Sequence, residues 1–72
     1  MNMKFTERFN EVLKYCGKTQ TDIANAIHVR KQCVSDYKFG KSVPSIETLY
    51  LICDFLDVSA DYLLGLDDIE KK

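Results

Sequence analysis

Seventy-two residues, 46% of them hydrophobic, are enough for one small domain. With no apolar run near the roughly 18 residues of a membrane span and no signal-peptide pattern, we expect a cytoplasmic protein without a membrane partner. The net charge of −1 is unevenly distributed, because residues 1–45 carry +4 and residues 46–72 carry −5. This asymmetry favours one face that meets a polyanion, with ordinary solvated surface charge as the alternative.

The first predicted helix covers residues 5–16. Apolar side chains recur there at helical period, and Gly17 follows as a C-terminal cap. The apolar face consists of Phe5, Phe9, Val12, Leu13 and Cys16.

Two short helices joined by a tight turn are predicted over residues 20–27 and 30–38. In the first of them, Thr19 is the predicted N-cap and Asp22 can bond back to it. In the second, the helical period places Val34 and Tyr37 inward. The outer face is rich in groups that hydrogen-bond base edges: Lys31, Gln32, Ser35 and Asp36.

Residues 39–45 form the only long breaker segment, and two further helices are predicted after it. The first covers residues 46–56, with Ser45 as its N-cap. The second covers residues 60–64, with Ser59 as N-cap and Gly65 at its end. The inward stripe of the longer helix is Ile46, Leu49, Ile52, Cys53 and Leu56. We therefore expect one all-α domain over residues 1–66 and a flexible charged tail over residues 67–72.

Several short motifs occur in a specific order along residues 5–66. They are Thr19-Gln20, Ile23-Ala24, Val29, Val34, Tyr37, Gly40-Lys41, residues 44–49 and residues 58–65. In this order and spacing the chain resembles the lambda-repressor-like, Cro-type helix-turn-helix proteins, a family of phage and bacterial regulators. The resemblance implies a compact five-helix fold and a sequence-specific transcriptional regulator, most simply a repressor that occupies a DNA operator.

The resemblance also assigns the candidate DNA-binding residues. Gln20 matches the family's phosphate-contacting glutamine, at a helix N-terminus whose N–H groups and dipole favour an anion. The groove-reading positions are Arg30, Lys31, Gln32 and Asp36, with Ser35 close by. Lys and Arg suit guanine, Gln suits adenine, and Asp can accept from cytosine. Contacts with the DNA backbone are implied for Lys41 and Ser42, and Lys38 can also point at DNA.

Two residues of the turn depart from the family pattern. His28 stands where the family usually has Gly, because the turn tends to need a positive φ. Arg30 stands where Ser or Thr commonly caps the recognition helix. A cation at this positive helix end is more easily understood if Arg30 reaches a phosphate or a base.

The last predicted helix carries more apolar side chains than one side can bury. We expect a two-fold dimer contact formed by Tyr62, Leu63, Leu64 and Leu66. The two recognition helices would then enter successive major grooves of a palindromic operator, about 34 Å apart. The alternative is that all four side chains cover the core of a single copy.

Other functions are weighed against DNA binding. A helix-turn-helix fold could instead bind another regulator through its acidic C-terminal half or its last helix. We expect no enzyme activity, cofactor or small-molecule ligand, since no catalytic triad, phosphate loop or carboxylate pair with a pocket is present. The odd, widely spaced cysteines argue against a disulfide framework and against metal binding. Cys16 and Cys53 fit core positions, whereas Cys33 lies on the DNA side, where a redox-sensitive thiol is conceivable.

Overall fold

The computed structural model describes residues 4–67, which form five α-helices and no strand. The helices are α1 (Phe5–Tyr15), α2 (Gln20–Ala26), α3 (Lys31–Phe39), α4 (Ile46–Leu56) and α5 (Ala60–Leu64). The predicted all-α class is confirmed, and the predicted bounds of α4 and α5 agree with the structure. α1 and α2 each end one residue earlier than predicted, because Cys16 and Ile27 occupy cap positions. α3 is shifted by one residue at both ends, because Arg30 is its N-cap and Phe39 is still helical.

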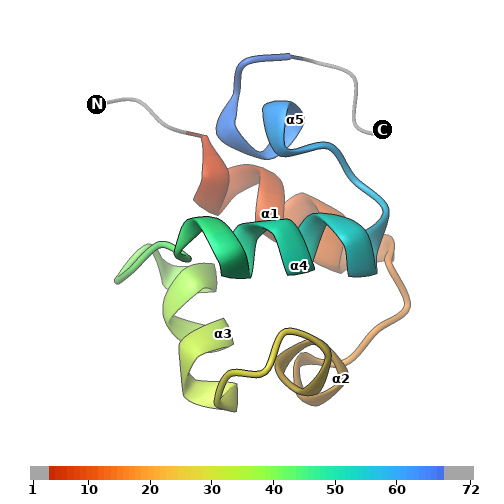
Figure 1. Ribbon diagram of the computed structural model, residues 1–72, viewed down its shortest axis with the longest axis vertical. Helices are drawn as coiled ribbons and strands as arrows, with labels where there is room; N and C mark the ends of the chain where they lie inside the picture. The colour runs from red at the N-terminus through yellow and green to blue at the C-terminus, as the bar shows by residue number, and fades with distance from the viewer. Residues whose placement is uncertain (1–3, 68–72) are drawn as a thin grey trace.

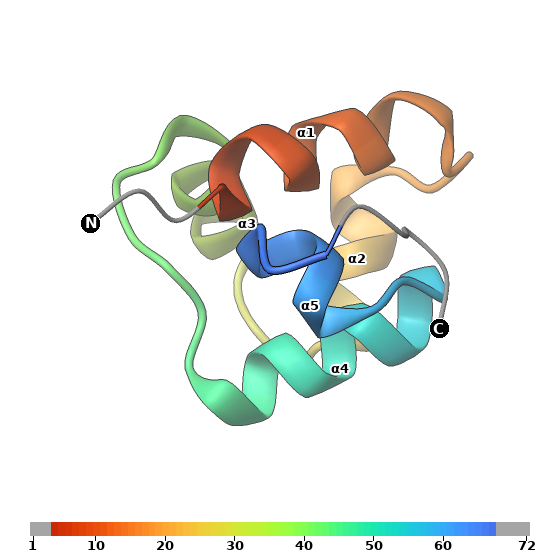
Figure 2. The same cartoon turned by 90° about the horizontal axis from the view of Figure 1, so that it is seen from above.

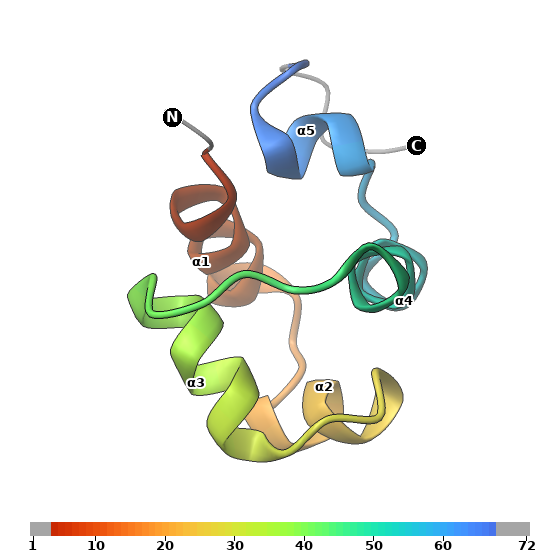
Figure 3. The ribbon, with the colours of Figure 1, turned by 60° about the vertical axis from the view of Figure 1, so that its left-hand side comes forward.

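The helices pack in three levels. α1 and α4 lie on opposite sides of the molecule, α5 closes one end, and α2 with α3 forms the other end (Figures 1 and 2). Figure 3 shows α3 beside α2 at the end farthest from α5. The predicted tail, residues 67–72, lies outside the described residues except for Asp67. No helix within residues 4–67 has the length and apolar character to cross a membrane.

The core is built mainly from the apolar faces that the sequence predicts. Phe5 and Phe9 stack with ring centroids 5.2 Å apart, and both meet Tyr37 of α3 edge-on at 6.3 Å. Such aromatic pairs stabilise a fold beyond their buried area. They fix α3 against α1.

The prediction that Ile46 belongs to the inward stripe of α4 is wrong. Ile46 is 88% exposed, whereas Ile52 and Cys53 are buried and Leu49 and Leu56 are partly covered. Ile46 is the first residue of α4, directly after the Ser45 cap. Helical period alone could not predict that no other helix covers this position.

The five-residue helix α5 depends on contacts with α1, because so short a helix is unstable alone. Arg8 Nη1 donates to the backbone oxygens of Tyr62 and Asp67 at 2.8 and 2.6 Å. The guanidinium also lies 4.4 Å from the centroid of the Tyr62 ring. The Tyr62 hydroxyl donates to Glu11 Oε2 at 3.1 Å. We call Arg8, Glu11 and Tyr62 the α1–α5 clamp.

Candidate nucleic-acid interface

The turn between α2 and α3 redirects the chain within a few residues. His28 adopts a left-handed conformation with φ of 60°, which a non-glycine residue tolerates at some strain. The Val29 N–H donates to the Ala24 carbonyl at 3.0 Å and closes the end of α2. Val29 packs against the core, so the turn is fixed from inside.

Two side-chain amides hold α3 at its two ends. At the start, Gln20 Nε2 donates to the Lys31 carbonyl at 3.1 Å. At the end, Asn10 Nδ2 donates to the Lys38 carbonyl at 2.8 Å. Gly40 then ends the helix in the left-handed region at φ 74°. The sequence analysis did not assign a role to Asn10. A polar amide beside the apolar face of α1 was the feature that could have indicated a contact with another helix.

The inner face of α3 is anchored as predicted, with Val34 and Tyr37 buried. Burial raises the pKa of Tyr37 above its ordinary value of 10.0, and the neighbouring Cys33 and Asp36 raise it further. The phenol therefore stays neutral at physiological pH. Cys33 is half-buried and packs against the core, so its side chain contributes to the packing of α3.

The outer face of α3 presents polar side chains in the order that the sequence predicts. Lys31 and Gln32 are exposed, and Ser35 and Asp36 are partly exposed. Gln32 Nε2 donates to Asp36 Oδ1 at 2.9 Å, one helical turn away. Phe39 continues the same face and is 70% exposed, an apolar residue that the predicted site did not include.

Positive charge gathers around α3. Residues 23–46 hold four cations and one acid, which are Arg30, Lys31, Lys38, Lys41 and Asp36. Arg30 is the N-cap residue but forms no capping bond with its side chain. A cluster of this sign raises the local concentration of an anionic partner. Lys41 and Ser42 are exposed directly after the Gly40 cap.

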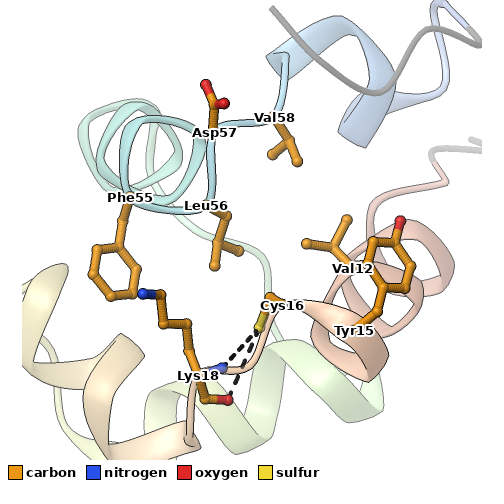
Figure 4. Close-up of a pocket in the computed structure, with 8 residues that line it drawn as sticks. All are labelled: Val12, Tyr15, Cys16, Lys18, Phe55, Leu56, Asp57 and Val58. Carbon is orange, nitrogen blue, oxygen red and sulfur yellow. Dashed lines mark hydrogen bonds between the residues drawn. The ribbon is translucent and has the colours of Figure 1, made fainter.

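Four cations of the basic half lie outside this cluster, and two of them, Arg8 and Lys18, make defined contacts elsewhere. Arg8 lies in the α1–α5 clamp. Lys18 extends across a hollow of about 210 Å³ between the C-terminal ends of α1 and α4, with its Nζ 5.4 Å from the Phe55 ring centroid (Figure 4). Cys16 lines the same hollow, and its sulfur accepts from the Lys18 N–H at 3.4 Å. Within residues 4–67, no three His, Cys, Asp or Glu side chains gather as metal ligands would.

The predicted dimer residues lie in different environments, which corrects that set. Leu63 is fully buried and Tyr62 nearly so, because both face the core between α1 and α4. Neither can offer its side chain to a second copy. Leu64 is partly exposed and Leu66 is 76% exposed, so these two residues remain available for a contact.

Comparisons with known proteins agree with this geometry. A helix-turn-helix family model matches residues 11–63. The HTH-type transcriptional regulator ImmR of Bacillus subtilis is 31% identical over 97% of this chain and 55% of its own. The cryptic phage CTXphi transcriptional repressor RstR of Vibrio cholerae is 35% identical over 88% of this chain and 56% of its own. The chain thus spans little more than half the length of these curated relatives.

A solved structure has the same fold. The crystal structure of a transcriptional regulator from Listeria innocua superposes with a TM-score of 0.82 at 28% identity. The match covers 90% of this chain and 61% of that one.

Proposed function

The chain belongs to the Cro/C1-type helix-turn-helix family, and on this premise we propose that it regulates transcription by binding a specific DNA sequence. The outer face of α3 carries the proposal. Apart from Phe39 it is polar, it is surrounded by cations, and it is held at both ends by the amides of Gln20 and Asn10. A rigid helix of this kind suits the major groove, where each base pair presents a distinct pattern of donors and acceptors.

In this proposal, phosphate contacts position the protein and a few side chains read bases. Gln20, Lys38, Lys41 and Ser42 contact the DNA backbone. Arg30, Lys31 and Gln32 read base edges, with Ser35 and Asp36 beside them. Gln20 can keep its bond to the Lys31 carbonyl while its second N–H meets a phosphate, because an amide has two N–H groups.

We further propose that the protein acts as a repressor and binds a palindromic operator as a homodimer. The repressor role is suggested by the similarity to RstR, which is named as a phage transcriptional repressor. Occupying an operator would block access to the promoter. A two-fold dimer would place two α3 helices in successive major grooves.

An apolar surface around the start of α4 is the most suitable dimer contact. Ile46 projects between two hollows of about 200 and 320 Å³. We define the α4 patch as Val43, Ile46, Leu49, Tyr50 and Leu64, which line these hollows. A projecting side chain beside an apolar hollow can fit the same feature of a second copy, as an isologous contact requires. Through Leu64, its last residue, α5 would still take part in the dimer contact, as the sequence predicts.

The function is tested by selecting bound duplexes from a random DNA pool with the purified protein at two salt concentrations. We expect a palindromic motif whose two half-sites are centred one helical turn apart. A failure to enrich any motif, with weak binding that disappears in modest salt, would refute sequence-specific reading.

Alanine variants separate base reading from phosphate contact. Lys31→Ala and Gln32→Ala should each reduce discrimination at particular base pairs by about 1–3 kcal/mol. Lys41→Ala should weaken binding to all sequences and reduce its salt dependence. Titrations of selected and random duplexes at several salt concentrations measure both effects. Similar losses on both kinds of DNA for all three variants would contradict these roles.

A protein-interaction module is the second candidate function. The observation that favours it is the exposed α4 patch on a half of the domain that has no Lys or Arg between residues 42 and 67. In that case binding to a partner would survive high salt and would depend on the α4 patch rather than on α3. DNA binding with a steep salt dependence would decide against it.

A further inference from the structure

We propose that Asp36 is a positioning residue that makes Gln32 select adenine over guanine at one base pair. The inference rests on the proposed DNA-binding function and adds the identity of one base to it. Its basis is the bond from Gln32 Nε2 to Asp36 Oδ1, 2.9 Å long, on the outer face of α3. Asp36 is the one acid of this helix.

The chemistry of the pair fixes the orientation of the Gln32 amide. An ionised carboxylate only accepts hydrogen bonds, so the NH₂ group of Gln32 must face Asp36 and Oε1 must face away from it. The amide has two N–H groups, and one of them is held by Asp36. Gln32 is left with one N–H donor and one carbonyl acceptor for a base. This combination matches the N7 acceptor and the N6–H donor of adenine.

Guanine does not suit the amide in this state. It presents two acceptors in the major groove, N7 and O6, so a side chain that binds it needs two donors. Gln32 could supply both N–H groups only by giving up its bond to Asp36. Asp36 therefore disfavours guanine more strongly than adenine, although it need not touch either base.

This role differs from direct reading of cytosine by Asp36, which the family resemblance implies. In direct reading the carboxylate accepts from cytosine N4, and its effect does not depend on Gln32. In positioning, its effect passes entirely through the Gln32 amide. A double-mutant cycle separates the two mechanisms.

The test uses the selected operator with A·T or G·C at the base pair where Gln32→Ala loses its preference. Dissociation constants from fluorescence anisotropy give the adenine-to-guanine preference of each variant. We expect Asp36→Ala to reduce this preference about tenfold, while binding to both duplexes strengthens because a negative charge is removed. Asp36→Asn retains an acceptor without the charge, so its preference should lie between those of the other two proteins. Thermal melts by circular dichroism check that every variant is folded.

The same comparison in the Gln32→Ala background decides the mechanism. There, Asp36→Ala should leave the adenine-to-guanine preference unchanged. The proposal is overturned if the preference still changes without Gln32, because Asp36 would then read the base itself. It is also overturned if Asp36→Ala has no effect when Gln32 is present. If the parent protein selects no motif from the random pool, the proposed function fails first and this inference fails with it.

Discussion

Arg8→Ala is expected to lower the free energy of unfolding by about 3 kcal/mol. Hydrogen bonds that involve a charged group contribute about 1.5–3 kcal/mol, and a partly exposed cation–π contact adds about 0.5–1 kcal/mol. Arg8 makes both kinds of contact with α5, through the Tyr62 and Asp67 carbonyls and the Tyr62 ring. Its charge also lies at the C-terminal end of α5, where the helix dipole favours a cation.

The loss is large for so small a domain. Domains of this size have a total stability of only about 4–10 kcal/mol, and a loss of about 3 kcal/mol should lower Tm by about 12–24 °C. Urea and thermal unfolding followed by circular dichroism measure both quantities. Lys14→Ala is the matched control, because Lys14 is an exposed cation on the same helix and should change stability by less than about 0.5 kcal/mol. Equal losses in the two variants would show that the α1–α5 clamp does not stabilise α5.

Ile46→Glu is expected to weaken binding to a full palindromic operator by about 100-fold and to leave half-site binding nearly unchanged. Two linked binding units gain about 10²–10⁴ in affinity over one, and this gain is lost when the copies separate. Ile46 is 88% exposed, so the change leaves the core intact. A carboxylate at the first position of α4 is also favourable for the helix dipole.

The physical cause of the loss is charge at a contact between identical surfaces. In a two-fold dimer the two introduced carboxylates would lie in the α4 patches, beside Asp54, an acidic residue that lines one of the adjoining hollows. Analytical ultracentrifugation at concentrations where the parent protein dimerises should show monomer. Tyr15→Glu is the control, since Tyr15 is an exposed aromatic residue of α1 outside the α4 patch. Dimers that persist in Ile46→Glu would exclude the α4 patch as the contact.

The helices and their ends were predictable because their signals lie within a few residues of each other. Thr19 and Asp22 form both bonds of a capping box, and Ser45 caps the backbone N–H of Thr48. The same local signals predicted the outer face of α3, since the buried Val34 and Tyr37 fix which side of the helix turns outward. The residues of the candidate site were therefore accessible to sequence reasoning, although their roles on DNA stay predictions.

Other features were not predicted. Asn10 reaches α3 across 28 positions, so its contact depends on how distant segments pack. The bond between Gln32 and Asp36 is local, but it depends on side-chain conformations that helical period does not fix. Phe39 was overlooked on the outer face because the predicted helix ended at residue 38 and residue 39 was assigned to the breaker segment, whereas α3 includes it.

The sequence by itself determined the five helices, the Thr19, Ser45 and Ser59 caps, most of the core and the family. Tertiary structure alone decided which apolar side chains are covered and which groups Arg8 and Lys18 contact. Leu63 was predicted in a dimer contact and Ile46 in the core, yet Leu63 is buried and Ile46 is exposed. Arg8 belongs by sequence to the basic half but binds the end of α5, 54 positions away. The reason is physical: periodicity defines the face of a helix, whereas burial and charge pairing require the neighbour that covers it.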